Sequence, residues 1–149
     1  MKIAVGSDHA GFPLKQHVVE RLRGQGHDVL DFGTNGPDSV DYPDFAVKVS
    51  RAVTDGRAER GVLVCGTGIG MAMTANRIPG IRAANCSSEY CAVMSRRHND
   101  ANVLTLGARL LTPDVADRIV DVWLDTGFDG GRHAARVRKI SELDAAGSS

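Results

Sequence analysis

Short apolar runs alternate with stretches of helical periodicity along nearly the whole chain. Five of these runs have the length and composition of buried strands. They cover Ile3–Ser7, Asp28–Phe32, Gly61–Cys65, Ile81–Cys86 and Val103–Leu106. Between them apolar side chains recur every three or four positions, as Leu14, Val18 and Leu22 do, which is the spacing of one helical face. The alternation predicts βαβ units and therefore a mostly parallel sheet.

The helices are indicated by this periodicity and by one clear start signal. Helical segments include residues 14–22, 45–53 and 71–76, one that begins at Thr112, and a last one from about 132 to 143. Thr112 followed by Pro113 is typical of a helix N-terminus. Together the elements predict an α/β fold, a single-domain, Rossmann-like three-layer sandwich with a five-stranded parallel sheet. We expect the domain to cover residues 1–144 and residues 145–149 to form a disordered tail.

Composition excludes several classes of protein. The chain has 149 residues, of which 42% are hydrophobic, and this suits one compact domain. Basic and acidic residues both number 18, so no net charge favours nucleic acid as a partner. No apolar run approaches the roughly 18 residues of a membrane span, and no signal peptide precedes the first predicted strand. We therefore expect a cytoplasmic protein that binds neither membranes nor nucleic acid.

The three cysteines, Cys65, Cys86 and Cys91, indicate free thiols. Their odd number argues against a disulfide framework, and their spacing is not that of zinc ligands. We expect no bound metal. Cys86 and Cys91 have no evident partner and are assigned to packing.

Cys65 opens the segment with the strongest chemical signal, Cys65-Gly66-Thr67-Gly68-Ile69-Gly70. A thiol is placed where a buried strand gives way to a helix, beside glycines that leave backbone N–H groups open to a ligand. A deprotonated thiol can take a proton from carbon there, although a buried cysteine more often serves as a small hydrophobic side chain. The glycine spacing fits neither a dinucleotide site nor a P-loop.

Further candidates lie near the ends of predicted strands, where parallel sheets bind ligands. Asp8 and His9 follow the first strand and can bind sugar hydroxyls or phosphate, although Asp8 also suits a helix N-cap. His98 and Asn99 precede the fifth strand. The histidine suits a general acid near neutral pH, and a solvated histidine in a polar turn explains the pattern equally well. Arg109 comes soon after the fifth strand.

Arg132 and Arg136 are four residues apart and share one face of the last predicted helix. Two guanidinium groups near a helix N-terminus suit a phosphate group. Arg138 and Lys139 lie close by in the sequence, so a solvated basic face is the competing interpretation.

Six separated segments carry motifs in one order along the chain. They are Gly6-Ser7-Asp8-His9-Ala10-Gly11, Asp41-Tyr42-Pro43, Cys65-Gly66-Thr67-Gly68-Ile69-Gly70, Gly80-Ile81-Arg82-Ala83, Arg97-His98-Asn99-Asp100-Ala101-Asn102 and Gly130-Gly131-Arg132-His133. Taken together they resemble the type B ribose-5-phosphate isomerase family, which includes related allose- and galactose-6-phosphate isomerases. The resemblance spans about residues 2–143, and it alone indicates the class of substrate.

The resemblance implies an aldose–ketose isomerase that interconverts ribose 5-phosphate and ribulose 5-phosphate without metal or organic cofactor. Cys65 would move a proton between C1 and C2 through a cis-enediolate, and the loop 66–70, with Thr67 among the catalytic residues, would present N–H donors to the oxyanion. His98 would be the acid that opens the sugar ring. Some branches of the family use a glutamate later in this loop as the base, but here the loop continues Met71-Ala72.

The resemblance also implies a set of binding residues and a partner chain. The substrate-binding residues are Asp8, His9, Gly66, Gly68, Ile69, Gly70, Asn99, Arg109, Arg132 and Arg136. The three arginines would hold the phosphate, and His9 would lie close by. The family is dimeric, sometimes tetrameric, with active sites shared between subunits. We therefore expect a homodimer in which the arginines of one subunit complete the site of the other.

Three alternatives remain open from the sequence. The first is an isomerase of a six-carbon sugar phosphate, which differs from the five-carbon substrate by one hydroxymethylene group. The second is a non-catalytic or nucleotide-binding module that holds a phosphate at Gly66–Gly70. The third is a thiol redox protein, which would need Cys86 or Cys91 close to Cys65. The loop Gly33–Val40 is assigned no role.

Overall fold

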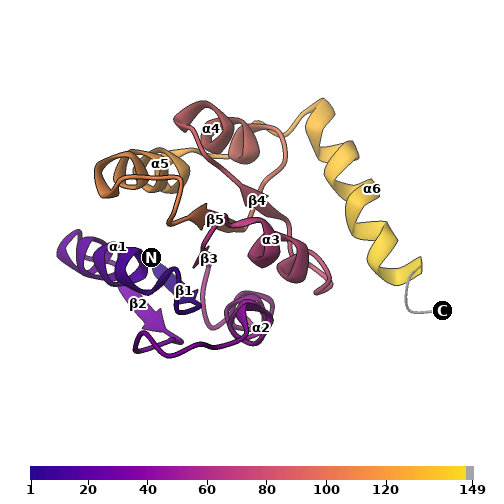
Figure 1. Ribbon diagram of the computed structural model, residues 1–149. Helices are drawn as coiled ribbons and strands as arrows, with labels where there is room; N and C mark the ends of the chain where they lie inside the picture. Colours follow the sequence, from indigo (N-terminus) through magenta and orange to yellow (C-terminus); the bar gives the residue numbers. More distant parts are fainter. Residues whose placement is uncertain (147–149) are drawn as a thin grey trace.

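A computed structural model describes residues 1–146 as a parallel sheet between layers of helices (Figure 1). The strands are β1 (Lys2–Ser7), β2 (Asp28–Asp31), β3 (Arg60–Cys65), β4 (Ala83–Asn85) and β5 (Val103–Gly107). The helices are α1 (Phe12–Gly24), α2 (Tyr42–Thr54), α3 (Ile69–Ala75), α4 (Glu89–Arg97), α5 (Pro113–Asp125) and α6 (Arg132–Ala146). All four strand pairings are parallel, in the order β2-β1-β3-β5-β4. The predicted α/β fold with a five-stranded parallel sheet is confirmed.

The fourth strand is shorter than the predicted run Ile81–Cys86. Before the strand, the Ile81 N–H bonds to the Ile78 carbonyl in a turn, and the Arg82 N–H donates to the side chain of Asn102. β4 pairs only with β5, so it forms one edge of the sheet. The apolar run Ile81–Cys86 is therefore longer than the segment that pairs with β5.

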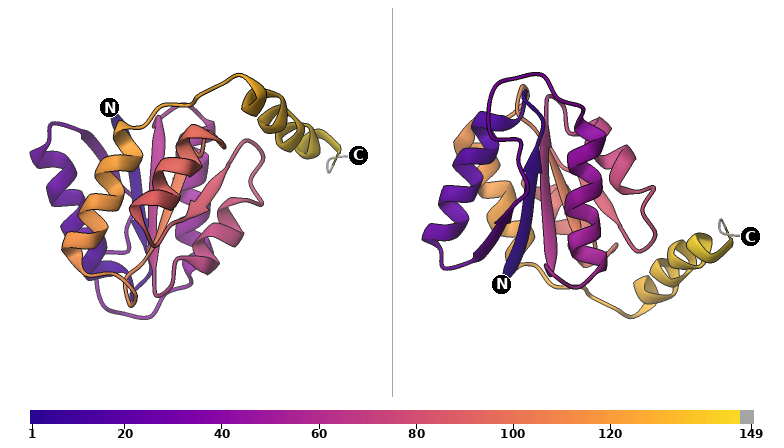
Figure 2. Two further views of the ribbon diagram at one scale, coloured as in Figure 1. Left: turned by 90° about the horizontal axis from the view of Figure 1, so that it is seen from above. Right: turned by 90° about the horizontal axis from the view of Figure 1, so that it is seen from below.

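The two faces of the sheet pack against different helices. α1, α4 and α5 cover one face, and α2 and α3 cover the other (Figure 2). Side chains alternate along β3, so Val62 and Val64 join the first core while Leu63 and Cys65 join the second. Trp123 of α5 is fully buried in the first core. The alternation directs Cys65 toward the α2–α3 side.

Helix α6 projects away from the rest of the molecule (Figure 2). At its start His133 stacks on His98, and near its end Asp144 accepts a hydrogen bond from the Gly80 N–H. Ile140 and Leu143 of this helix are 44% and 68% exposed. An amphipathic helix held mainly at its two ends leaves apolar surface uncovered within this chain.

The helix also corrects the expected tail. Ala145 and Ala146 continue α6, so the predicted disordered segment does not begin at residue 145. The rest of that segment, 147–149, lies outside the described residues. None of the helices over residues 1–146 is both long and apolar enough to cross a membrane.

The strand order creates a crevice at the carboxyl edge of the sheet. β1 lies between β2 and β3, so the chain leaves β1 in one direction and returns on its other side. Loops from such neighbouring strands separate at this point, and ligands of open α/β sheets bind there. The segments that follow β1 and β3 begin with Asp8 and Cys65, two of the predicted site residues.

Candidate active site

The Cys65 thiol lies at the end of β3, with only 5% of the residue exposed. Its sulfur accepts a hydrogen bond from the Gly68 N–H at 3.2 Å. The next amide, that of Ile69, donates to the Thr67 hydroxyl at 3.3 Å. These two N–H groups of the loop are therefore bonded within the loop itself, and one of them faces the sulfur.

Gly68 is required by both backbone conformation and space. Its φ of +81° is left-handed, a conformation that side chains disfavour. A Cβ there would run into the side-chain oxygen of Asn85 and lie 3.0 Å from the Leu106 backbone carbon. Thr105 donates its hydroxyl proton to the same Asn85 oxygen at 3.0 Å, which fixes the amide. A larger residue at position 68 would displace the N–H that faces Cys65.

Arg109 is held over this loop by hydrogen bonds between neighbouring segments. The Ala108 N–H donates to the Cys65 carbonyl at 2.9 Å, and the Arg109 N–H donates to the Gly66 carbonyl at 3.0 Å. The guanidinium covers Gly66 so closely that a Cβ on this glycine would lie 3.0 Å from its Nη1. The structure thus brings a positive charge beside the thiol of the same chain, whereas the resemblance implied that the other subunit supplies the arginines.

Asp8 enters the same region from β1. Its residue is 7% exposed, and one carboxylate oxygen accepts the Gly11 N–H at 3.0 Å. This bond closes the turn before α1, whose N-cap is Gly11 and has no side-chain cap, so the interpretation of Asp8 as the N-cap is wrong. Asp8 also faces the cavity beside Cys65, so it is available to a ligand as well.

These residues surround one open cavity of about 370 Å³, a size within the roughly 300–1,000 Å³ of small-molecule sites. Its lining consists of Asp8, Tyr42, Cys65, Gly66, Thr67, Ile69, Gly70, Met73 and Arg109. Seven of the thirteen predicted site residues therefore meet in one place. The residues on its walls include a carboxylate, a thiol and a guanidinium, groups that can bind a small anionic polyol.

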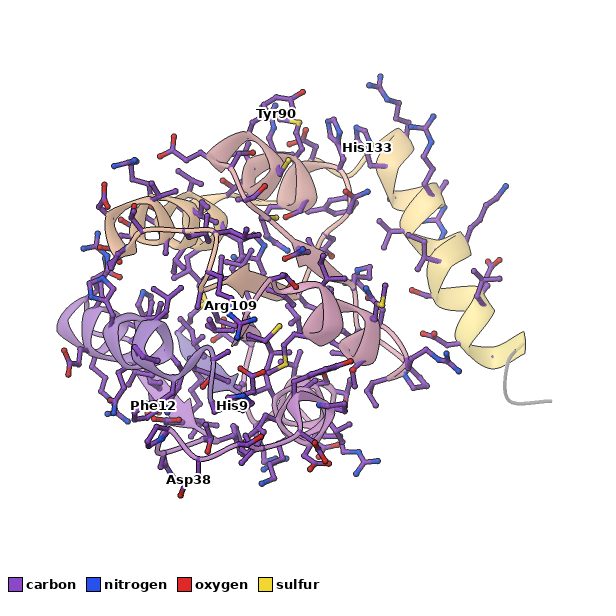
Figure 3. All side chains as sticks on the ribbon, viewed as in Figure 1. His9, Phe12, Asp38, Tyr90, Arg109 and His133 are labelled. Atoms are coloured by element: carbon purple, nitrogen blue, oxygen red, sulfur yellow. The ribbon has the colours of Figure 1, made fainter. Side chains whose placement is uncertain are left out.

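His9 borders this region without lining the cavity. Its Nδ1 accepts a hydrogen bond from the backbone N–H of Val40 at 3.1 Å. An N–H group can only donate, so Nδ1 carries the lone pair and the ring proton of a neutral His9 is on Nε2. Figure 3 shows His9 below Arg109, next to the loop that joins β2 to α2.

Four predicted site residues lie elsewhere. His98 ends α4 and stacks on His133, with ring centroids 4.2 Å apart and planes 10° apart. Asn99 lines a separate cavity of about 380 Å³ between α6 and β4. Arg132 and Arg136 are exposed at the start of α6. Figure 3 shows His133 at the α4–α6 junction, away from Arg109 over the sheet. One chain therefore separates the candidate base from the candidate acid.

The surroundings of His133 are electropositive. Burial lowers the pKa of this histidine, and the nearby His98, Arg132 and Arg136 lower it further, against an opposing effect of Asp129. The two arginines thus add positive charge around His133. A phosphate dianion would relieve this repulsion, so the cluster is prepared for an anion.

The same cluster has the spacing of metal ligands. His98, Asp129 and His133 bring three ligand atoms within 4.8 Å of one another. Imidazole lone pairs lie in the ring plane, however, so two stacked rings direct them side by side and not toward one point. Arg97 also pairs with Asp129 at 3.2 Å. The geometry and the charges both fit an anion better than a cation.

The three cysteines are free and lie in different environments. Cys65 belongs to the core on the α2–α3 side of the sheet, whereas Cys86 belongs to the core on the other side. Burial raises the pKa of Cys86 to about 11, so its thiol stays protonated. Cys91 is exposed, which contradicts its assignment to packing. The sheet separates Cys65 from Cys86, which argues against a redox pair between them.

Several residues near the cavity were not predicted. Tyr42 packs its ring against Gly70, and Met73 is 69% exposed at the cavity rim. Asn85 supports Gly68 from the short edge strand. Tyr42 lies in the quoted Asp41-Tyr42-Pro43 motif, which could have pointed to it. Asn85 has no such signal, because its role depends on a neighbour that only the sheet brings close.

Comparisons with known proteins agree with this geometry. Residues 3–140 match the protein family described as Ribose/Galactose Isomerase. A protein named ribose-5-phosphate isomerase B from Escherichia coli (strain K12) is 46% identical over 96% of this chain and 96% of its own. A structure described as ribose-5-phosphate isomerase B from Clostridium thermocellum is 53% identical, with a TM-score of 0.97 over 98% of this chain and 99% of its own.

A third relative acts, by its name, on a smaller sugar. It is a D-erythrulose-4-phosphate isomerase from Pectobacterium atrosepticum, 42% identical over 94% of this chain and 93% of its own. Relatives with similar identities thus carry names with different sugar phosphates. What they share with this chain is the length, the fold and the kind of reaction in their names. The chain belongs to the ribose/galactose isomerase family.

Proposed function

We propose that this protein interconverts ribose 5-phosphate and ribulose 5-phosphate, with Cys65 as the catalytic base. The observation that carries the proposal is the thiol beside Arg109 and Asp8 in one cavity at the carboxyl edge of the sheet. This arrangement occurs in a chain that belongs to the ribose/galactose isomerase family. The reaction needs a base near a carbon acid, donors for an oxyanion and a cation for the phosphate.

The proton transfer can be written on residues of this chain. The Cys65 thiolate takes the C2 proton of the open-chain aldose, and the electron pair of that bond moves toward the C1 carbonyl to give a cis-enediolate. The N–H groups of residues 66–70 stabilise the negative oxygen, and Thr67 lies at the same turn. The thiol returns the proton to C1 while the proton on O2 moves to O1, which yields the ketose with its carbonyl at C2. Atoms and electrons balance without a cofactor or a metal.

The binding residues divide into two groups that match the two ends of the substrate. Asp8 and His9, with Asn99, hold the sugar hydroxyls and ring oxygen. Arg109, Arg132 and Arg136 bind the phosphate at the other end of the substrate. His98 donates the proton that opens the ring.

We infer a homodimer in which each site combines the Cys65 cavity of one chain with the α4–α6 junction of the other. His98, Asn99, Arg132 and Arg136 do not line the Cys65 cavity of their own chain. The rim of that cavity exposes Met73 and Ile69, and α6 exposes Ile140 and Leu143. A second copy whose α4–α6 junction meets this rim would cover apolar surface on both chains and complete two sites by symmetry. Assembly into a tetramer would leave this arrangement unchanged.

The first experiment measures isomerisation of ribose 5-phosphate by the purified protein in the presence of EDTA. Erythrulose 4-phosphate, allose 6-phosphate and galactose 6-phosphate are tested alongside. Fastest turnover of the five-carbon sugar supports the proposal, and preference for another sugar keeps the mechanism but changes the substrate. Uptake of deuterium from heavy water at C2 of recovered aldose tests the enediolate directly. Absence of turnover with all four sugars would refute the assignment.

A mixing experiment tests the shared site. Cys65→Ala and His98→Ala chains are each expected to be inactive alone. After subunit exchange in a one-to-one mixture, half of the dimers contain one chain of each kind, and each such dimer has one intact site. About a quarter of the wild-type activity should therefore return. A mixture that stays inactive although mass spectrometry detects mixed dimers would exclude a site built from two chains.

A second candidate function is less well supported. A nucleotide-binding module would leave the Cys65 thiol and the His98–His133 pair without a role, and nucleotides should then raise the melting temperature while sugar phosphates do not.

A cytoplasmic setting fits the proposed chemistry, because a thiol that acts as a base has to remain reduced.

A further inference from the structure

Lys15 is buried in a helix face that is otherwise apolar. Only 1% of its side chain is exposed, although it lies on α1 next to Leu14 and close to Val18. Its ammonium group donates to both carboxylate oxygens of Asp31, at 2.9 and 3.0 Å. The Asp31 side chain is 22% exposed, so it is the Lys15 ammonium whose removal from water the pair has to offset, and this cost calls for an explanation beyond stability.

Asp31 connects this ion pair to the end of β1. The oxygen that accepts from Lys15 at 2.9 Å also accepts the Gly33 N–H at 2.9 Å. Gly33 in turn accepts the Ser7 N–H at 2.7 Å, and the Thr34 N–H donates to the Ser7 carbonyl at 2.8 Å. Ser7 directly precedes Asp8 and His9. The buried pair thus fixes the start of the loop 33–40 against the backbone that carries two site residues.

The other end of this loop contacts His9 itself. The Val40 N–H donates to His9 Nδ1 at 3.1 Å, which leaves the ring proton on Nε2. The loop is therefore tied to the first strand at both ends, by Ser7 at its start and by His9 at its finish. Lys15 is too deeply buried to contact a ligand and acts only through this chain of bonds.

We propose that the Lys15–Asp31 pair and the loop 33–40 form a positioning device that selects the Nε2–H tautomer and orientation of His9. Lys15 and Asp31 are positioning residues, not catalytic ones. The tautomer matters because it presents a donor to the substrate and leaves the acceptor nitrogen occupied by Val40. The kinetic part of this inference rests on the proposed function, whereas the tautomer of His9 does not.

The test variant is Lys15→Met, which keeps the length of the side chain and removes its charge. The control is Arg21→Met on the same helix, whose guanidinium pairs with Asp121 of α5 at 2.6 Å and does not contact the loop. NMR of protein with ¹⁵N-labelled histidine reports which His9 nitrogen carries the proton. We expect one Nε2–H tautomer in the wild type and in Arg21→Met, and a mixture of tautomers in Lys15→Met.

Kinetics give a second readout. A small misplacement of His9 should raise KM for the sugar phosphate about tenfold in Lys15→Met, with kcat almost unchanged. In a His9→Ala background the same substitution should leave KM unchanged, because both changes act through one ring. An equal rise of KM in both backgrounds, or an unchanged His9 tautomer in Lys15→Met, would overturn the inference.

Asp31→Asn keeps the test decisive if Lys15→Met fails to fold. It retains the size of the side chain and an acceptor for the Gly33 N–H but weakens the bond to Lys15. The same loss of the single His9 tautomer is expected, and its retention would count against the device. The NMR measurement needs no substrate. A protein inactive on every sugar tested would therefore refute the proposed function, whereas the tautomer of His9 in the variants would still confirm or overturn this inference.

Discussion

Replacing Gly66 by alanine tests whether Arg109 is held where the proposed phosphate contact needs it. The added Cβ would lie 3.0 Å from Arg109 Nη1, 3.3 Å from Cζ and 3.5 Å from Cδ. All three atoms belong to a flexible side chain, and the backbone of Gly66 is not in the left-handed region. The methyl group should therefore move the guanidinium and leave the fold intact.

The magnitude follows from these distances. A comfortable carbon–nitrogen contact needs about half an ångström more than 3.0 Å, which is a large error for a charged hydrogen bond. A charge-assisted bond contributes roughly 1.5–3 kcal/mol, so its complete loss in Arg109→Ala should weaken substrate binding about 10- to 150-fold. Partial displacement in Gly66→Ala should give the lower part of this range, near tenfold.

The assay measures KM and kcat for ribose 5-phosphate, and the dissociation constant of ribitol 5-phosphate, which has no carbonyl to isomerise. Gly24→Ala is the matched control, because nothing lies within 4 Å of a Cβ at that position. The double variant Gly66→Ala/Arg109→Ala should bind no more weakly than Arg109→Ala alone. Unchanged affinity in Gly66→Ala, or fully additive effects in the double variant, would refute the reasoning.

Three further predictions concern thiols and histidine. Cys65→Ala should lose deuterium exchange at C2 while it still binds ribitol 5-phosphate; near-normal turnover would remove the thiol from the mechanism. Burial lowers the pKa of His133, so its ring binds a proton more readily in the unfolded chain than in the folded one. The free energy of unfolding should therefore fall as the pH decreases below about 6.5, the ordinary pKa of histidine. Thermal melts of His133→Phe should show a smaller fall over the same pH range. Iodoacetamide near neutral pH should label the exposed Cys91 long before Cys86, and mass spectrometry that finds equal labelling would contradict the raised pKa of Cys86.

The sheet and its helices could be predicted because their signals are local. Leu14, Val18 and Leu22 lie on one helical face in the sequence and in one core in the structure. The loop 66–70 could be placed for the same reason, since a buried strand followed by glycines indicates its own geometry. The position of Cys65 at the end of a strand, beside a glycine-rich loop, could thus be predicted from the sequence.

Contacts between distant segments could not be predicted in this way. A lysine on a helix is usually solvated, yet Lys15 is buried because its ammonium group pairs with Asp31 of the neighbouring β2. The length of α6 was underestimated for a related reason. Ala145 and Ala146 favour a helix as much as a frayed end, and small side chains carry no pattern that separates the two.

A site divided between two chains, as proposed above, would explain why the sequence alone made His98 and Arg132 look incidental. Both lie near the α4–α6 junction, which does not border the Cys65 cavity. A short motif is recognised as catalytic when its partners follow at a spacing that one fold can bring together. On this proposal no spacing along the chain can do so, because the second group would meet the first only where another copy supplies it. The stacked histidines and the arginines around them would then form an anion site that one chain leaves incomplete. The mixing experiment addresses this assembly directly, since no single substitution separates a residue that acts in its own chain from one that acts in the neighbouring chain.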